Sequence, residues 1–366
     1  MNTCMPDYQN CCLNLISSIS GYFGCPLAHP TLPFLDGKLE KKRYRNIIVM
    51  LFDGMGVDIL NKALPENSFF RTHLPHVLSA VYPSTTTNAT TAIECGLSPR
   101  EAGWLGWTLY FPQIQKPVDI FINRSNGEIA ADYNVAQRFI PRTMLFPRIT
   151  AAGQAKACCV SRFGDVKAET RDELFDTVLT LARDEQPRYI YAYDGDPDHT
   201  MHEAGCYAPQ VLELVRDFDR RVEKLARELP DDTLLLVTAD HGLIDSEFHY
   251  LDEEAPELLD MLVHAPSIEA RAVSFHVKPE CKDAFPGVFL KHYAGHFRFM
   301  PGETFIRDFL GDGETRPNVY DFVGDYMALA TDHWCLQDHR GDHELKGVHA
   351  GLTEQEMRVP LIVAKE

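Results

Sequence analysis

The sequence predicts an α/β protein with a mainly parallel central sheet. Three observations support this class: short apolar runs that fit buried strands, stretches of helical period between them, and aspartates directly after several runs. Parallel strands need a crossover connection, which a helix usually supplies. Ligands of such sheets gather at the carboxyl ends of the strands, so the aspartates also indicate where a functional site would lie.

Size and composition are those of a globular protein. The 366 residues are enough for one elaborated domain, or for a core with a second lobe. No apolar run is long enough to span a bilayer, so no membrane partner is expected. The net charge of −18 disfavours binding to nucleic acid and to anionic membrane surfaces. A site for an anionic substrate would therefore need metal ions or amide dipoles.

The N-terminus and the cysteines favour a cytoplasmic protein. The first 20 residues, "MNTCMPDYQNCCLNLISSIS", lack the basic lead and the sustained apolar stretch of a signal peptide. Ten cysteines are spread along the chain without a CxxC pair. We expect them to be reduced and mostly buried, and we expect no cysteine zinc site.

The elements follow one another in an α/β rhythm. Residues 1–43 are expected to form an N-terminal extension, irregular over the proline- and glycine-rich 22–37. The catalytic domain would then span 44–366. The expected strands are 46–52, 155–161, 188–194, 233–240 and 359–364, and the expected helices are 57–64, 169–183, 209–229 and a stretch ending at Cys95. Two segments depart from this rhythm: 104–147 suggests an insertion over one edge, and 246–339 suggests a smaller lobe.

Acidic residues follow three of the expected strands. Asp53 follows the first, Asp194, Asp196 and Asp198 follow the third, and Asp240 follows the fourth. A single aspartate in this position often caps the next helix. Several at one sheet edge, accompanied by histidines, instead indicate a metal site.

The histidines near these aspartates have ligand-like spacing. His202 lies four residues after Asp198, which places both side chains on one helix face. His241 adjoins Asp240, and His349 lies in the small-residue stretch "GVHAGL". Carboxylate with imidazole suits zinc and also admits manganese. The remaining nearby histidines are weaker candidates, namely His199, His339 and His343.

The stretch 80–96, "AVYPSTTTNATTAIECG", is crowded with threonine. It could be a helix start with spare polar side chains, or one hydroxyl could be a nucleophile. Two metal ions about 4 Å apart can clamp the attacking and leaving oxygens of a phosphoryl transfer. A hydroxyl bound to such an ion would lose its proton readily.

Together these motifs resemble the alkaline phosphatase superfamily, specifically its type I phosphodiesterase/nucleotide pyrophosphatase branch. The matching pieces occur in the family's order: "FDGMG", "YPSTTTNATTAIECGLSP", "PDHTMHEAG", "TADHG" and "GVHAGLTEQEMRVPLIV". The resemblance implies an alkaline-phosphatase-like three-layer sandwich. It also implies an enzyme that hydrolyses phosphodiester or pyrophosphate bonds in a small phosphate ester.

The resemblance also implies roles for individual residues. Counting ten residues back from the glycine of the Gly-Leu-x-Pro turn identifies Thr86 as the nucleophile, with Thr85 and Thr87 as competitors by register. Two divalent metals are implied; the histidine content favours zinc, and manganese is the alternative. The first would be held by Asp53, Thr86, Asp240 and His241, and the second by Asp198, His202 and His349. The implied reaction forms a phospho-threonine intermediate, which water activated at the second metal releases.

One position departs from the family pattern. Many members have a phosphate-binding asparagine 21 residues after the nucleophile, where this chain has Trp107. Trp104 and Trp107 could form a stacking wall for a leaving group, or they could be core residues of the insertion.

Three other functions fit parts of this pattern. A phosphomonoesterase or phosphonate hydrolase could use the same core, although no arginine closely follows Thr86 to meet the terminal oxygens. A phosphosugar mutase would need a different nucleophile motif. A metal-binding protein without turnover is possible, although the full ligand set favours catalysis. The sequence does not indicate the oligomeric state.

Overall fold

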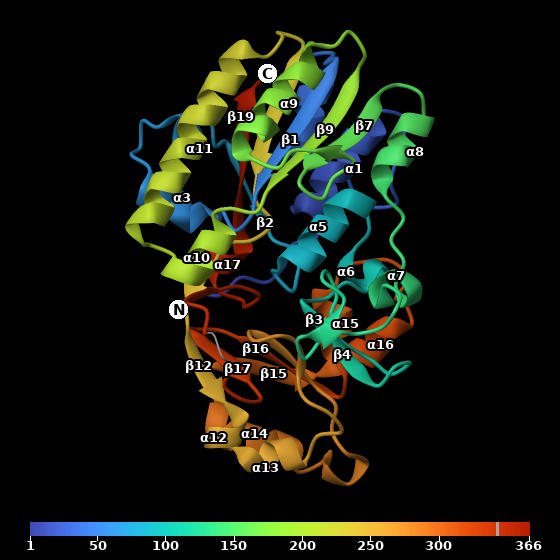
Figure 1. The fold of residues 1–366 in the computed structure, drawn as a ribbon, viewed down its shortest axis with the longest axis vertical. Coiled ribbons are helices and arrows are strands. Elements are labelled where there is room, and N and C mark those ends of the chain that lie inside the picture. Colours follow the sequence, from blue (N-terminus) through green and yellow to red (C-terminus); the bar gives the residue numbers. More distant parts are fainter. Residues whose placement is uncertain (342–343) are drawn as a thin grey trace.

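The computed structural model describes residues 1–341 and 344–366, and a seven-stranded sheet forms its larger half (Figure 1). The sheet order is β2 (His76–Ser79), β19 (Arg358–Lys365), β10 (Thr233–Thr238), β1 (Asn46–Phe52), β9 (Arg188–Asp194), β7 (Lys156–Ser161) and β8 (Val166–Lys167). The central strand β1 pairs in parallel with both β10 and β9. Only β19 runs antiparallel to its neighbours. The expected mainly parallel sheet is therefore confirmed.

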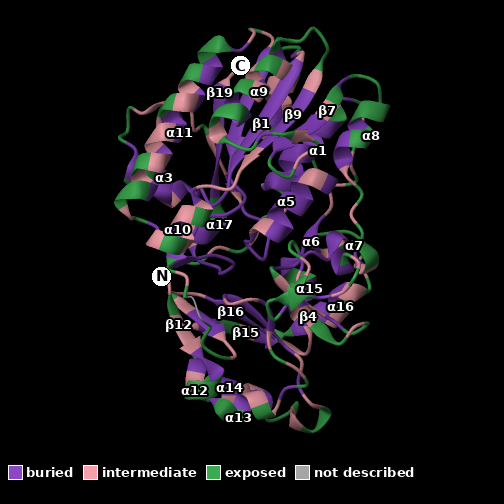
Figure 2. Cartoon of the chain, viewed as in Figure 1, coloured by how far each residue is buried: buried purple, intermediate pink, exposed green. Residues whose placement is uncertain are grey.

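Helices and short connections complete this half. The helices are α1 (Cys12–Tyr22), α2 (Pro33–Leu39), α3 (Val57–Ala63), α4 (Phe69–Thr72), α5 (Thr86–Cys95), α6 (Pro99–Ala102), α8 (Leu145–Ala151), α9 (Arg171–Arg183), α10 (Asp198–Ala204), α11 (Pro209–Glu228) and α17 (Glu354–Met357), whereas α7 (Val135–Phe139) lies next to the smaller lobe. All seven residues of β1 are buried, as expected for a strand covered on both faces (Figure 2).

Aromatic contacts show the three layers. Phe52 of β1 stacks on Phe218 of α11, with ring centroids 4.1 Å apart. On the neighbouring strand β9, Tyr191 stacks on Phe146 of α8 at 6.1 Å. Tyr191 pairs with Val49 of β1, which lies three residues before Phe52. Because side chains alternate between the two faces along a strand, the two aromatic contacts lie on opposite faces of the sheet. Helices therefore cover both faces, which confirms the three-layer arrangement.

The smaller lobe is a mostly antiparallel structure below the main sheet in Figure 1. Its eight-stranded sheet has the order β15 (Phe297–Pro301), β16 (Tyr326–Ala330), β14 (Ala272–Phe275), β13 (Ser267–Glu269), β3 (Thr108–Phe111), β4 (Lys116–Asp119), β5 (Arg124–Ser125) and β6 (Glu128–Ile129). The two segments set apart in the sequence analysis thus join in one sheet. The join is the bridge between Ile268 and Thr108.

The remaining elements lie in or beside the lobe. The helices are α12 (Leu251–Glu254), α13 (Pro256–Asp260), the 3₁₀ turn Pro279–Cys281, α14 (Phe285–Tyr293), α15 (Gly302–Phe309) and α16 (Asn318–Val323). The short strands β11 (Ile244–Asp245) and β18 (Gly347–Val348) pair with each other, as do β12 (Glu247–Tyr250) and β17 (Trp334–Gln337). A separate apolar cluster, centred on Phe275, Phe285 and Phe289, forms the lobe's own core.

The N-terminal region differs from its expected irregularity. The expectation for 22–37 is wrong from Pro33 onward, because α2 begins there. Proline fits the first helical position, since its fixed φ is helical and its missing N–H would have no helical partner. The preceding helix α1 is buried through most of its length and packs against α5.

The cysteines are mostly buried and unpaired. All ten cysteines lie in the described part; seven are buried and none forms a disulfide. Among the described residues, none of the helices combines the length and apolar character needed to cross a bilayer.

A fully buried ion pair ties the lobe to the main half. Arg271 donates from Nε and Nη2 to the two carboxylate oxygens of Glu356, at 2.7 and 2.9 Å. Glu356 also accepts hydrogen bonds from the backbone N–H groups of Gly351 and Thr353. Arg271 lies between two lobe strands, whereas Glu356 lies in α17, so the pair holds the two halves together.

We predict that Glu356→Gln lowers the free energy of unfolding by about 3 kcal/mol, because it leaves the buried Arg271 charge without its partner. Urea denaturation would measure the loss. Glu223→Gln is the control, since it removes an exposed helical pair with Arg227 and should cost less than about 1 kcal/mol. Equal losses in the two variants would contradict a special role for the buried pair.

Candidate active site

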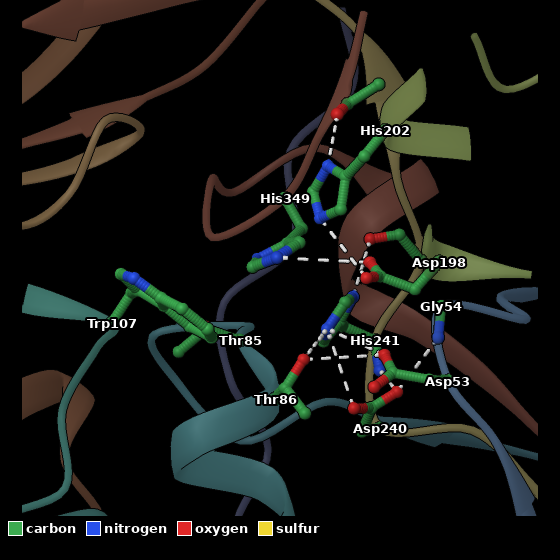
Figure 3. Close-up of polar contacts among 12 residues, drawn as sticks. Asp53, Gly54, Thr85, Thr86, Trp107, Asp198, His202, Asp240, His241 and His349 are labelled. Carbon is green, nitrogen blue, oxygen red and sulfur yellow. Dashed lines mark hydrogen bonds and ion pairs between the residues drawn. The ribbon is translucent and has the colours of Figure 1, made fainter. Parts of the chain in front are cut away.

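Four segments bring polar side chains together at the carboxyl ends of the central strands (Figure 3). Asp53 follows β1, α10 with Asp198 follows β9, Asp240 with His241 follows β10, and His349 follows β18. Gly54 permits the close approach of the segment after β1, which carries Asp53, to α10, which carries Asp198. It has a φ of +72°, and a Cβ there would lie 2.5 Å from a Leu243 methyl carbon and 3.0 Å from the Asp198 Cβ.

Thr86 is the first residue of α5 and points into this cluster. Its Oγ1 lies 3.1 Å from Nε2 of His241 and 3.4 Å from Oδ1 of Asp53 (Figure 3). The N-terminal turn of α5 also directs backbone N–H groups and the positive end of the helix dipole toward this end of the sheet. A hydroxyl at a helix start beside a buried carboxylate and an imidazole has the surroundings of a nucleophile.

The neighbouring hydroxyls are directed elsewhere. Thr85 donates to Oε1 of Glu269 at 2.7 Å, and Thr90 and Thr91 each donate to the backbone carbonyl four residues earlier. The Thr87 hydroxyl is buried and has no hydrogen-bond partner. Of the three threonines in register, the structure therefore brings only Thr86 to the aspartates and histidines.

Asp240 is oriented by the backbone. Its Oδ1 accepts hydrogen bonds from the N–H groups of Gly54 and His241, both at 3.0 Å. Its Oδ2 is buried without a hydrogen-bond partner and lies 3.5 Å from Nε2 of His241. One oxygen is thus fixed by amides, while the other remains available to a ligand.

The second group of predicted ligands forms around Asp198. Its Oδ2 lies 3.2 Å from Nε2 of His202, and its Oδ1 lies 3.9 Å from Nε2 of His349. The Nδ1 of His202 contacts the carbonyl of Gly347 at 2.7 Å, which orients the ring with Nε2 toward the site.

Crowding of carboxylates shifts several pKa values. Burial and the neighbouring Asp240 and Asp198 raise the pKa of Asp53 well above its usual value. Burial opposes ionisation of Asp198, but the histidines around it, His202 foremost, hold its pKa below the usual range. Burial would lower the pKa of His202, but the Asp198 carboxylate raises it to about 9. Converging negative charges of this kind favour a site for cations.

The donor atoms fit divalent metal ions. Ligand atoms of Asp198, His202 and His349 lie within 4.8 Å of one another, and so do those of Asp53, Asp198 and His241. Asp198 belongs to both groups, whereas the family resemblance assigned it to one metal. Among the predicted ligand residues, three buried atoms have no hydrogen-bond partner, namely Asp198 Oδ1, Asp240 Oδ2 and His349 Nδ1. Unpaired buried carboxylate oxygens are costly unless a cation binds them.

Other polar residues from the sequence analysis stand outside this cluster. Asp194 and Asp196 both bind Arg171, at 2.7 and 2.9 Å, so they are structural. His199 and His339 are exposed and belong to neither ligand group. His343 lies outside the described residues.

Two site residues escaped the sequence analysis. Tyr193, the penultimate residue of β9, donates a hydrogen bond to Oδ2 of Asp53. Glu269, at the end of β13, accepts from Thr85 and from the backbone N–H of Trp107. Burial raises the pKa of Glu269 to about 7. A tyrosine inside a buried strand and a glutamate inside an insertion carry no local signal, since only the folded chain brings them to the site.

The two tryptophans have different environments. Trp104 is buried and donates its indole N–H to the carbonyl of Ile140, so it is a core residue of the insertion. Trp107 is 41% exposed, and its ring makes an edge contact with Phe121. Figure 3 shows Trp107 set apart from the cluster of aspartates and histidines, on the side of Thr85.

A cleft of about 700 Å³ opens beside Thr86, between the main half and the lobe. Its walls include Asp198, His202 and His349 from the main half, together with Trp107 and Glu269 from the lobe. This volume accommodates a small organic ligand.

These features define the class of the protein: an alkaline-phosphatase-like α/β enzyme with its polar cluster at the carboxyl ends of the parallel strands. The chain belongs to the family described as type I phosphodiesterase/nucleotide pyrophosphatase, which matches residues 47–350. It therefore belongs to a family of enzymes.

Curated relatives match parts of the chain. Human ectonucleotide pyrophosphatase/phosphodiesterase family member 7 is 34% identical over 90 residues, which are 23% of this chain and 19% of that protein. The catalytic subunit of human GPI ethanolamine phosphate transferase 3 is 26% identical over 127 residues, which are 33% of this chain and 11% of that protein. The chain thus spans less than a fifth of either relative.

Solved structures share the fold over most of the chain. Murine ectonucleotide pyrophosphatase/phosphodiesterase 5 has a TM-score of 0.65 at 17% identity, with 86% of this chain and 87% of that chain covered. Phosphonoacetate hydrolase from Sinorhizobium meliloti 1021, in complex with phosphonoformate, has a TM-score of 0.64 at 19% identity, with 88% and 90% covered. An inactive threonine-to-alanine variant of the murine protein, in complex with AMP, has a TM-score of 0.63 at 18% identity, with 87% of each chain covered.

We predict that zinc stabilises the chelator-stripped protein and that His202→Ala weakens the effect. A ligand present at 100 times its dissociation constant stabilises by about 2.7 kcal/mol, which corresponds to several degrees in Tm. Thermal denaturation with and without zinc would measure the shift. His339→Ala is the control, because its exposed ring lies outside both ligand groups, and it should keep the full shift. An unchanged shift in His202→Ala would place the bound zinc elsewhere.

Proposed function

We propose that the protein is a two-metal hydrolase of small phosphodiesters or pyrophosphates and that Thr86 is its nucleophile. The observation that carries the proposal is the contact of the Thr86 hydroxyl with Asp53 and His241, beside buried donor atoms that lack partners. The threonine-to-alanine replacement that inactivates the murine structural neighbour supports a threonine nucleophile. A cytoplasmic location is part of the proposal and is supported by the ten unpaired cysteines.

The chain would hold the two ions with the two ligand groups. Asp53, Asp240 and His241, with the Thr86 oxygen, provide one set of donors, and Asp198, His202 and His349 provide the other. Zinc suits this mixture of carboxylate and imidazole, and manganese is the alternative. When bound, such ions lower the pKa of an oxygen nucleophile and neutralise phosphate charge.

The residues of the chain then perform a double displacement. Thr86 Oγ1 loses its proton to solvent and forms a bond to phosphorus while the bond from phosphorus to the leaving oxygen breaks, and the leaving group takes up a proton from solvent. Water next attacks the phospho-threonine, the bond from phosphorus to Oγ1 breaks, and Thr86 regains its proton. The contacts of Asp53 with Tyr193 and of Asp240 with Gly54 hold these carboxylates in place throughout.

The cleft favours a diester over a monoester. Among the described residues that line it, none is a lysine or arginine, and the Glu269 carboxyl group lies close to Thr85. A dianionic monoester would need cationic side chains to meet its terminal oxygens, whereas a diester carries one negative charge. A monoesterase or phosphonate hydrolase on this core is the second candidate, supported by the fold of phosphonoacetate hydrolase.

We predict that zinc-loaded protein hydrolyses bis-p-nitrophenyl phosphate and that Thr86→Ala lowers kcat/KM by about a thousandfold or more, because it removes the nucleophile. Release of p-nitrophenolate would measure both rates, with p-nitrophenyl phosphate as the monoester comparison.

The matched control is Thr87→Val, which removes a neighbouring hydroxyl that makes no hydrogen bond. It should retain most of the activity. Turnover of the monoester alone would show that the protein is a monoesterase. Undiminished activity of Thr86→Ala would exclude Thr86 as the nucleophile.

A further inference from the structure

Both carboxylates of the first ligand set, which comprises Asp53, Thr86, Asp240 and His241, have one oxygen occupied by the protein itself. Oδ2 of Asp53 accepts a hydrogen bond from the Tyr193 hydroxyl. Oδ1 of Asp240 accepts two hydrogen bonds from backbone N–H groups, both at 3.0 Å. Their other oxygens, Asp53 Oδ1 and Asp240 Oδ2, lie 3.4 and 3.5 Å from Nε2 of His241. Each carboxylate therefore offers a single oxygen to an ion.

The first ligand set consequently presents one donor atom from each of its residues. Besides the two carboxylate oxygens, these donors are Nε2 of His241 and Oγ1 of Thr86, which are 3.1 Å apart (Figure 3). Zinc favours tetrahedral sites and accepts both imidazole nitrogen and carboxylate oxygen. Manganese favours octahedral sites that are rich in oxygen, and a carboxylate that binds through both of its oxygens helps to complete such a site. A set limited to one oxygen per carboxylate therefore suits zinc better.

The carboxylate of the second ligand set, Asp198 with His202 and His349, is not restricted in this way. Oδ1 of Asp198 has no hydrogen-bond partner among the described residues and lies 3.9 Å from Nε2 of His349. Oδ2 lies 3.2 Å from Nε2 of His202. Because both oxygens face proposed ligands, Asp198 can bind an ion through one oxygen or through two. The chain thus restricts the carboxylates of the first set only.

Tyr193 is the side chain that restricts Asp53. It belongs to a row of three tyrosines in β9, Tyr189, Tyr191 and Tyr193, whose alternate positions place them on one face of the strand. Within the described part of the chain, the buried hydroxyls of Tyr189 and Tyr191 have no hydrogen-bond partner, whereas the Tyr193 hydroxyl donates to Asp53. The last tyrosine of the row is therefore distinguished from the others by its contact with a proposed metal ligand.

We propose that Tyr193 is a positioning residue through which the first ligand set selects zinc over manganese, because its hydroxyl holds Asp53 to one free oxygen. This inference rests on the proposed function, in which the first set binds one of two divalent ions. Without the hydroxyl, Asp53 could present both oxygens, which would bring the set closer to the ligands that manganese favours. Hydrogen bonds to metal ligands typically change metal affinity by about 10- to 100-fold.

The test compares zinc with manganese in a protein whose second ligand set is disabled. His202→Ala is introduced into every protein, so that binding to the first set is measured alone. Tyr193→Phe then removes only the hydroxyl. Tyr191→Phe is the matched control, because it removes a hydroxyl without a described hydrogen-bond partner from the same face of the same strand. Calorimetric titration of the chelator-stripped proteins would give both dissociation constants, zinc in competition with a chelator of known affinity.

The informative quantity is the ratio of the two dissociation constants, because zinc exceeds manganese in affinity at most sites with these ligands. We expect Tyr193→Phe to weaken zinc binding by at least about tenfold and manganese binding by less than about threefold. Tyr191→Phe should leave both constants unchanged. A role of Tyr193 in the stability of the fold alone would weaken the binding of both metals by the same factor, and thermal denaturation of the metal-free proteins would show whether each is folded.

The outcomes separate this inference from the proposed function. An unchanged ratio in Tyr193→Phe, or a His202→Ala protein that binds no zinc, would overturn the inference even if the zinc-loaded wild-type protein hydrolyses bis-p-nitrophenyl phosphate. An equal change of the ratio in Tyr191→Phe would also overturn it, since that hydroxyl does not contact Asp53. A lowered ratio in Tyr193→Phe alone, without diester turnover by the wild-type protein, would uphold the role of Tyr193 and contradict the proposed hydrolase.

Discussion

The buried ion pair between Arg271 and Glu356 is the interaction on which the arrangement of the cleft depends. Arg271 also donates hydrogen bonds to the carbonyls of Asp332 and Trp334, so it connects separate segments of the lobe. Glu356 accepts from the turn that follows His349, and its backbone carbonyl accepts from Gly242, the residue after His241. One pair of charges thus fixes two proposed metal ligands relative to the lobe. Because Glu269 lies two residues before Arg271, the same pair also positions the opposite wall of the cleft.

The negative charge of the site has a structural origin and a chemical use. Parallel strands end at one edge, so residues that follow them are brought together whatever their charge. Here these residues include three aspartates, and burial makes their repulsion costly. Divalent ions would relieve this repulsion, and the helix start at Thr86 adds backbone N–H groups for the substrate. A strongly acidic chain can therefore bind a phosphate ester, provided that the attraction comes from ions and amides rather than from lysine and arginine.

Prediction from the sequence succeeded where the signal was local. The strand 46–52 is a continuous apolar run bounded by a charged stretch and by Asp53, and the spacing of Asp198 and His202 places them on one face of a helical turn. The lobe could not be predicted in the same way, because Ile268 and Thr108 pair although they are 160 positions apart in the sequence, and neither strand is long. The helix at Pro33 was missed because proline was taken as irregular structure, although it suits the first helical turn. The metal ligands were predicted as a set, while their roles remain predictions.

Trp107 lies in the lobe wall of the cleft, apart from the aspartates and histidines at the strand ends. At the position where many family members are expected to have a phosphate-binding asparagine, this chain keeps a backbone N–H that contacts Glu269 and directs an indole to the cleft. This chain thus has a carboxyl group, that of Glu269, beside the position where such an asparagine would donate to a phosphate oxygen. A negative group beside a phosphate is costly unless positive charge lies next to it, and divalent ions held by Asp198, His202 and His349 would supply that charge. In the proposed mechanism the residues at the strand ends act on the phosphate, and the lobe forms the facing wall of the cleft.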